Sequence, residues 1–120
     1  MEFVFDNERP IYIQLVEQIR FEIISGRLAK GEKIPSVREL ALKVKVNPNT
    51  VQKALAELER DNLIYTERTN GKYVTEDENV IQKFKADVIN DKVGGFVADM
   101  KNIGISSTEI IEYLQNRERE

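Results

Sequence analysis

The chain has 120 residues, a formal net charge of −3, and neither cysteine nor histidine. The missing residue types exclude a disulfide framework, thiol or imidazole catalysis and the usual zinc sites, so we expect neither an enzyme nor a bound cofactor or metal. The sequence has no signal peptide and no long apolar run, which predicts a cytoplasmic protein without a membrane partner, built as one domain or one domain with a short appendage.

The first predicted elements are an apolar N-terminal segment and a helix. Phe3, Val4 and Phe5 lie close to the terminus, and we expect them to pack as an arm on the core or on a partner subunit. Residues 10–25 are predicted to form a helix, because apolar side chains recur on one face and Gly26 follows as a stop signal. The side chains of that face are Tyr12, Leu15, Val16, Ile19 and Ile23.

Residues 35–58 predict two short amphipathic helices joined by a tight turn. Ser36 and Glu39 indicate a capping box at the start of the first helix, and Asn47 followed by Pro48 indicates that the second begins at Pro48. Such a pair is typical of a helix-turn-helix, whose second helix enters a DNA major groove, but it also occurs in other all-α domains. The two apolar faces consist of Val37, Leu40, Ala41 and Val44, and of Val51, Ala54, Leu55 and Leu58.

The start of the second helix of this pair is polar and lies in a positive region. A recognition helix docks by its N-terminal turns, so we predict that their polar side chains contact bases and phosphates. Residues 35–53 contain four basic side chains and one acidic one, whereas residues 76–120 contain six and ten. The reading surface is therefore locally positive although the whole chain is acidic. The polar side chains at the helix start are Asn49, Thr50, Gln52 and Lys53.

A β-hairpin is predicted directly after the helix pair. Residues 63–68 and 72–75 have high β-propensity. The Asn70-Gly71 pair between them is a strong hairpin signal, typical of a type I′ turn with a positive φ at Gly71. A helix-turn-helix followed by a hairpin is a winged helix.

The hairpin has a structural and a functional role in this interpretation. A two-stranded hairpin alone is marginally stable, so Ile64 and Val74 must pack on the helices. Arg68 and Lys72 lie near the tip, where we expect them to contact the DNA backbone or the minor groove, with Gly71 shaping the tip.

Motifs between residues 9 and 75 form a dense and specific pattern. They are Pro10-Ile11-Tyr12, Ile24-Ser25-Gly26-Arg27-Leu28, Gly31 before Ile34-Pro35-Ser36-Val37-Arg38, Asn47-Pro48-Asn49-Thr50-Val51 and Leu63-Ile64. In these motifs the chain resembles the GntR family of bacterial transcription regulators, and its short tail resembles the YtrA-like subfamily, which lacks a large effector-binding domain. The family often has Gly-x-Gly-Thr in the wing, whereas this chain reads Thr69-Asn70-Gly71-Lys72.

The resemblance implies roles for individual residues in DNA binding. Arg38 would contact DNA from the start of the helix that follows Ser36. Thr50 would hold a phosphate at the start of the helix that begins at Pro48, where helix N–H groups favour anions. Asn49 matches a neighbouring polar contact. Gln52 stands where some relatives carry an arginine, and glutamine suits adenine better than guanine. Lys53 follows and would reach a phosphate.

The C-terminal part predicts two further helices. A long apolar stripe begins near Val80 or Ile81, and a second capping box, formed by Ser106 and Glu109, starts a last short helix. Two such helices cannot bury both their faces alone, so we expect them to pack on a second copy. The Gly94-Gly95 pair inside the long helix indicates either a close helix crossing or a kink. The expected dimerisation residues are Phe84, Val88, Phe96, Val97, Met100, Ile110 and Leu114.

Together these features predict an α+β fold that is mainly α. Residues 1–76 are expected to form a winged-helix DNA-binding domain, and residues 77–120 a C-terminal helical dimerisation segment. The predicted function is sequence-specific transcription regulation on an inverted-repeat DNA operator as a homodimer, and the resemblance implies repression. Two alternatives stay open: a winged-helix protein-interaction module, and a sensor that holds a small-molecule effector between the C-terminal helices.

Overall fold

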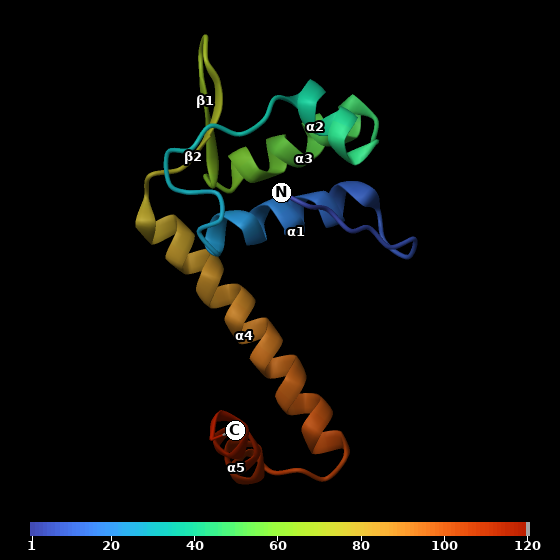
Figure 1. Cartoon of the computed structure of the whole chain (residues 1–120), viewed down its shortest axis with the longest axis vertical. Coiled ribbons are helices and arrows are strands. Elements are labelled where there is room, and N and C mark those ends of the chain that lie inside the picture. The colour runs from blue at the N-terminus through green and yellow to red at the C-terminus, as the bar shows by residue number, and fades with distance from the viewer. Residues whose placement is uncertain (120) are drawn as a thin grey trace. The chain divides into compact units, whose positions relative to one another are not determined.

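The computed structural model describes residues 1–119 of the chain. Their elements, labelled in Figure 1, are α1 (Ile11–Ile24), α2 (Val37–Val44), α3 (Pro48–Arg60), β1 (Ile64–Glu67), β2 (Gly71–Val74), α4 (Glu78–Asn102) and α5 (Ser107–Glu118). The chain forms two compact units, the first covering Met1–Lys85 and the second beginning at Ala86. The prediction of a mainly helical winged helix with C-terminal helices is confirmed. Among the described residues, no helix is both long enough and apolar enough to cross a lipid bilayer.

The core of the first unit lies between the amphipathic helices predicted from the sequence. Helices α1 and α3 lie side by side, and α2 packs on α3 (Figure 1). The apolar faces meet because each helix carries its buried side chains on one stripe. The residues with at most 1% exposure include Leu15, Ile19, Leu40, Val51, Ala54, Leu55 and Leu58.

Side chains fix the turn between α2 and α3 at both helix ends. The Ser36 hydroxyl accepts a hydrogen bond from the Glu39 N–H, and the Glu39 carboxylate accepts one from the Ser36 N–H, which is the predicted capping box. Helix α2 ends at Lys45, which adopts the left-handed conformation with φ 57°. The Asn47 side chain then accepts from the Asn49 N–H at 2.8 Å, and Pro48 occupies the first helical position as predicted.

The hairpin is present, but its turn differs from the prediction. Glu67 pairs with Gly71, so three residues form the loop, and the Asn70 N–H donates to the Glu67 carbonyl at 3.3 Å. Gly71 has the predicted positive φ of 109°, whereas Asn70 is not among the residues with positive φ. The type I′ turn was therefore wrong, because that turn needs positive φ at both central residues. The chain instead uses a three-residue loop, Arg68 to Asn70, which is followed by Gly71 with its positive φ.

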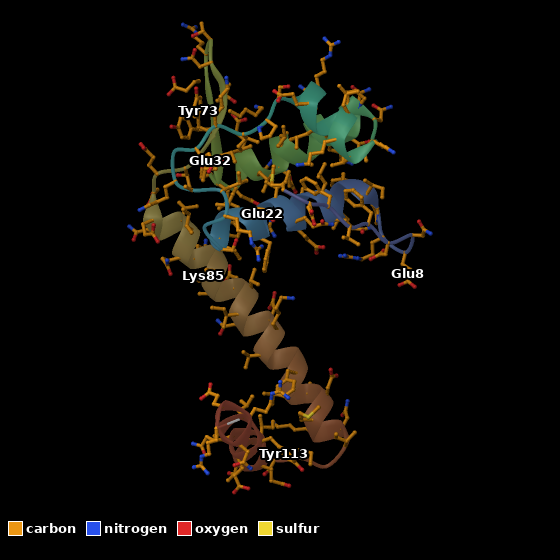
Figure 2. The ribbon with its side chains drawn as sticks, viewed as in Figure 1. Glu8, Glu22, Glu32, Tyr73, Lys85 and Tyr113 are labelled. Atoms are coloured by element: carbon orange, nitrogen blue, oxygen red, sulfur yellow. The ribbon has the colours of Figure 1, made fainter. Side chains whose placement is uncertain are left out.

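A third segment, which the sequence did not predict, pairs with the hairpin. The Ile34 N–H donates to the Lys72 carbonyl at 2.8 Å, and the Val74 N–H donates to the Glu32 carbonyl at 2.9 Å. Tyr73 therefore lies between β1 and the loop before α2 (Figure 2). Ile64 and Val74 are buried at 1% and 0% exposure, so the hairpin packs on the helices as predicted.

The first two turns of α4 belong to the first unit. Ile81 is buried, and the guanidinium of Arg20 lies over the ring of Phe84, 5.1 Å from its centroid. Arg20 also forms a salt bridge of 3.1 Å with Asp61, just after α3. One arginine thus links α1, α3 and the start of α4. The compact unit thus continues to Lys85. The boundary at residue 76 between the DNA-binding part and the dimerisation part concerns function and stays a prediction.

The second unit contains the remainder of α4 and the short α5. Gly104, with φ 83°, follows α4, and the predicted capping box of Ser106 and Glu109 starts α5. Gly94 and Gly95 lie within the unbroken α4, and no atom within 4 Å would meet an added Cβ at either position. Within residues 1–119, therefore, no close helix crossing depends on these glycines.

We predict that Asn47→Ala lowers the free energy of unfolding by about 1 kcal/mol, because it leaves the Asn49 N–H without its partner. Chemical denaturation with a far-ultraviolet circular dichroism readout measures the change. Asn7→Ala, in the exposed arm, is the matched control and should leave stability within about 0.5 kcal/mol. Equal stability of the two variants would contradict a role for the cap.

Candidate nucleic-acid interface

The N-terminal turns of α3 present the predicted polar residues to solvent. Asn49 and Gln52 are exposed, and Thr50 is half-buried with its N–H bonded to the Asn47 carbonyl at 2.9 Å. Because α3 begins at Pro48, all three lie within its first five residues. The first N–H groups of a helix point along its axis and carry partial positive charge, so this end of α3 suits an anion such as a phosphate.

Arg38 lies in the first turn of α2 and is exposed. Within residues 1–119 its guanidinium forms no salt bridge, so it is available to an external acceptor. A guanidinium can donate two parallel hydrogen bonds to a phosphate or to a guanine edge. These properties are those that its predicted role requires.

Lys53 has a partner that sequence reasoning missed. Its ammonium lies over the ring of Tyr12, 3.8 Å from the centroid, which joins α3 to the first turn of α1. Such a cation–π contact is worth about 0.5–1 kcal/mol at an exposed site. Tyr12 was predicted only as part of the apolar stripe of the first helix, and the short distance between the two helix starts is visible only in the fold.

Lys72 in the wing is also engaged. Its ammonium forms a salt bridge of 2.8 Å with Glu59 of α3, and it donates to the Thr66 hydroxyl at 2.8 Å. The hydrogen bond from Lys72 is the main reason that the pKa of Glu59 lies below its usual value. Lys72 therefore ties the wing to α3 and lies two residues beyond the loop. Arg68 in the loop and Gly71 directly after it are exposed.

The predicted dimerisation residues differ in exposure. Phe96 and Leu114 are large apolar side chains with 44% and 50% exposure, whereas Ile110 is buried within its unit. Phe84 belongs to the first unit and already contacts Arg20. The half-buried members are Val88, Val97 and Met100.

A hollow of about 280 Å³ in the second unit gathers several of these apolar residues. It is lined by Phe96, Met100, Ile103, Ile105, Ile110, Tyr113, Leu114 and Arg117. Further along the same helices, Ile89, Val93 and Ile111 are each at least 50% exposed. Metal-ligating clusters of three or more His, Cys, Asp or Glu are absent from residues 1–119.

Comparison with known proteins places the chain in a family. Residues 11–74, which span the three helices and the hairpin, match the model of the bacterial regulatory proteins of the gntR family. The chain belongs to the GntR family. It is 36% identical to the HTH-type transcriptional regulator YhcF of Bacillus subtilis, over 96% of this chain and 95% of that protein. It is 35% identical to the HTH-type transcriptional repressor YtrA of the same organism, over 91% and 85%.

Solved structures of GntR proteins agree with this assignment. A GntR family transcriptional regulator from Listeria monocytogenes is 43% identical and superposes with a TM-score of 0.86, over 93% of this chain and 98% of that one. The DNA-binding domain of AraR, solved in complex with operator ORX1, is 29% identical with a TM-score of 0.57, over 62% and 96%. The chain thus has the winged helix of the GntR transcription regulators and nearly the full length of its small relatives.

The tether between the wing and α3 can be tested by titration. We predict that Lys72→Met raises the pKa of Glu59 towards its usual value, because the hydrogen bond and charge that stabilise the carboxylate are removed. Carbon-detected NMR titration of the side-chain carboxyl measures this. Lys83→Met, at an exposed position of α4, should leave the pKa of Glu59 unchanged. An unmoved pKa in the Lys72 variant would mean that the tether does not persist in solution.

Proposed function

We propose that this GntR protein represses transcription by binding an inverted-repeat DNA operator as a homodimer. The observation that carries the proposal is the polar, solvent-facing start of α3, held in place by Asn47 and Pro48. The repressor name of YtrA and the operator complexes of the AraR domain support the same conclusion. A regulator of bacterial DNA acts in the cytoplasm, and the proposed role requires no catalysis.

In the proposed complex, α3 enters the major groove by its N-terminal turns. Gln52 is placed to read a base edge, with adenine as the best match for its amide, and Asn49 lies beside it. The Thr50 side chain takes a phosphate, which the positive end of the α3 helix dipole favours. Arg38 from α2 contacts either a base or a phosphate.

The proposed wing contacts come from the loop between β1 and β2. Arg68 is exposed there, and Gly71, with a φ of 109° that favours glycine, shapes the end of the loop. Lys72 contacts DNA after its salt bridge with Glu59 breaks, or else it keeps this salt bridge and holds the wing at a fixed distance from α3. In either case the buried Ile64 and Val74 keep the wing packed on the helices.

The homodimer is proposed from the apolar surface of the second unit. Phe96, Leu114 and Tyr113 are exposed at 44–66% around the apolar hollow of about 280 Å³. An apolar surface of this kind on a small protein marks an interaction site. A second copy is the proposed occupant, because a two-fold dimer presents two readers to the two halves of an inverted repeat.

The DNA surface is tested by substitution of Arg38 and Lys53. Arg38→Ala should cost about 1–3 kcal/mol of operator binding, because a base or buried phosphate contact is lost. Lys53→Ala should weaken all sequences evenly and lower the slope of log affinity against log salt by about one. Operator DNA recovered from a random pool and fluorescence anisotropy provide the measurement. Lys101→Ala, exposed on α4, is the control. Wild-type affinity in the Arg38 variant would remove it from the interface.

The dimer is tested with the full-length chain. Leu114→Glu should give a monomer in sedimentation velocity runs, because a charge would then enter the apolar interface. A monomer contacts one half-site and loses the tethering gain, which reaches ~10²–10⁴ in affinity. Lys101→Glu introduces the same carboxylate at a polar exposed position, with an even larger change of charge, and should remain dimeric. A wild-type chain that is monomeric at micromolar concentration would refute the homodimer.

A further inference from the structure

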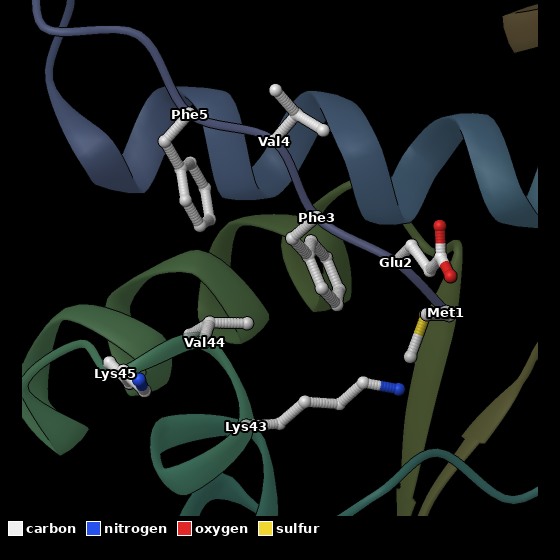
Figure 3. A pocket seen from close by; sticks show the side chains of 8 residues that line it. All are labelled: Met1, Glu2, Phe3, Val4, Phe5, Lys43, Val44 and Lys45. Atoms are coloured by element: carbon white, nitrogen blue, oxygen red, sulfur yellow. The ribbon is translucent and has the colours of Figure 1, made fainter.

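A pocket of about 340 Å³ lies between the N-terminal arm and the end of α2. Its lining comes from residues 1–5 on one side and Lys43–Lys45 on the other (Figure 3). The rings of Phe3 and Phe5 stack with their centroids 6.2 Å apart and point from the arm towards Val44. One wall is therefore aromatic, and the volume is at the lower end of the range for small-molecule sites.

The arm that forms this wall is held by buried and half-buried glutamines of α1. The Gln18 amide exchanges two hydrogen bonds with the backbone of Val4, at 3.0 and 2.6 Å. Gln14, which is 2% exposed, accepts from the Asp6 N–H at 2.9 Å and donates to the carbonyls of Asp6 and Arg9. The arm is thus fixed at two successive turns of α1, and the pocket wall exists before any ligand arrives.

The rim of the pocket carries more positive than negative charge. Lys43 and Lys45 are exposed and form no salt bridge within residues 1–119. The ammonium of Lys43 extends towards the side chain of Met1 (Figure 3). Glu2 is the acidic residue of the lining. Two lysines against one carboxylate give the lining a net charge of +1 and favour an anionic ligand.

We propose that this pocket binds a small aromatic anion, with its ring against Phe3 and Phe5 and its carboxylate or phosphate at Lys43. The two parts of the lining match the two parts of such a molecule: stacked rings favour a flat apolar body, and ammonium groups favour an anion. An aliphatic anion would lack the ring contact, and a neutral aromatic molecule would leave Lys43 without a partner.

The same pocket connects to the recognition helix through the chain. Lys45 is the left-handed residue that ends α2, and it lies two residues before Asn47, the cap of α3. An anion bound there neutralises positive charge beside the surface that faces DNA. Ligand binding and operator binding are therefore coupled negatively, and this second part of the inference depends on the proposed function.

Binding is tested without DNA by NMR titration of the full chain with 2-naphthoate as the probe. Amide signals of residues 1–5 and 43–45 should shift saturably. 2-Naphthalenemethanol, which has the same ring system and no charge, should bind roughly fivefold or more weakly, because the charge interaction with Lys43 is lost. No saturable shift, a shift centred on other residues, or equal binding of the alcohol would overturn the site.

Matched variants separate the charges from the ring wall. Lys43→Gln should weaken 2-naphthoate binding roughly two- to fivefold, and Glu2→Gln should tighten it by a similar factor. Lys101→Gln, outside the pocket, should bind as the wild type. Phe3→Leu keeps an apolar side chain but removes one ring, and it should weaken binding while the Val4 amide signal stays in place. An unchanged affinity in both charge variants would overturn the assigned position of the anion.

The coupling is measured separately, by anisotropy with selected operator DNA at constant ionic strength. Saturating 2-naphthoate should lower operator affinity about fivefold or more relative to an equal concentration of chloride. An unchanged affinity, after a successful titration, would overturn the coupling. A chain that binds the probe but no operator would refute the proposed function and leave the pocket assignment standing.

Discussion

The direction of α3 is the constraint on which the rest of the DNA-facing surface depends. It is set by two adjacent backbone features: the left-handed Lys45 at the end of α2, and the Asn47 cap with Pro48 at the start of α3. A residue with a Cβ adopts the left-handed conformation at a cost, so the turn persists only because the helices on both sides are anchored in the core. Val51 and Leu55 provide that anchor for α3, with at most 1% exposure. The position of α3 in turn places the polar side chains at its start.

Two of the basic residues on this surface have internal partners in the free protein. Lys53 lies on Tyr12, and Lys72 is paired with Glu59. Each partnership is weak, about 0–1 kcal/mol for an exposed ion pair or cation–π contact. A phosphate offers a stronger charge-assisted hydrogen bond together with the release of counterions. The internal partners therefore limit the motion of two long side chains at little cost to the exchange that the proposed DNA contacts require.

Local signals predicted much of the fold, and non-local contacts account for what was missed. Ser36, Asn47 and Pro48 act within three residues of themselves, so the sequence alone located their helix ends correctly. The strand-like pairing of residues 32–34 with β2 joins segments about forty residues apart, and no local pattern indicates it. The same holds for Lys53 on Tyr12 and Arg20 on Phe84. The Asn70-Gly71 pair predicted a hairpin, but the strand pairing of Glu67 with Gly71 decided which turn formed.

The two glutamines of α1 hold the arm by its main chain. Gln14 and Gln18 are four residues apart, so their amides lie one above the other on one helix face and bond to backbone groups of Val4, Asp6 and Arg9. Main-chain groups are the same in every residue except proline. Substitution of Phe3 or Phe5 during evolution would thus change what the neighbouring pocket accepts while the arm stays in place. A regulator with this attachment can acquire a new ligand preference by point mutation, without rebuilding the reader that the ligand would control.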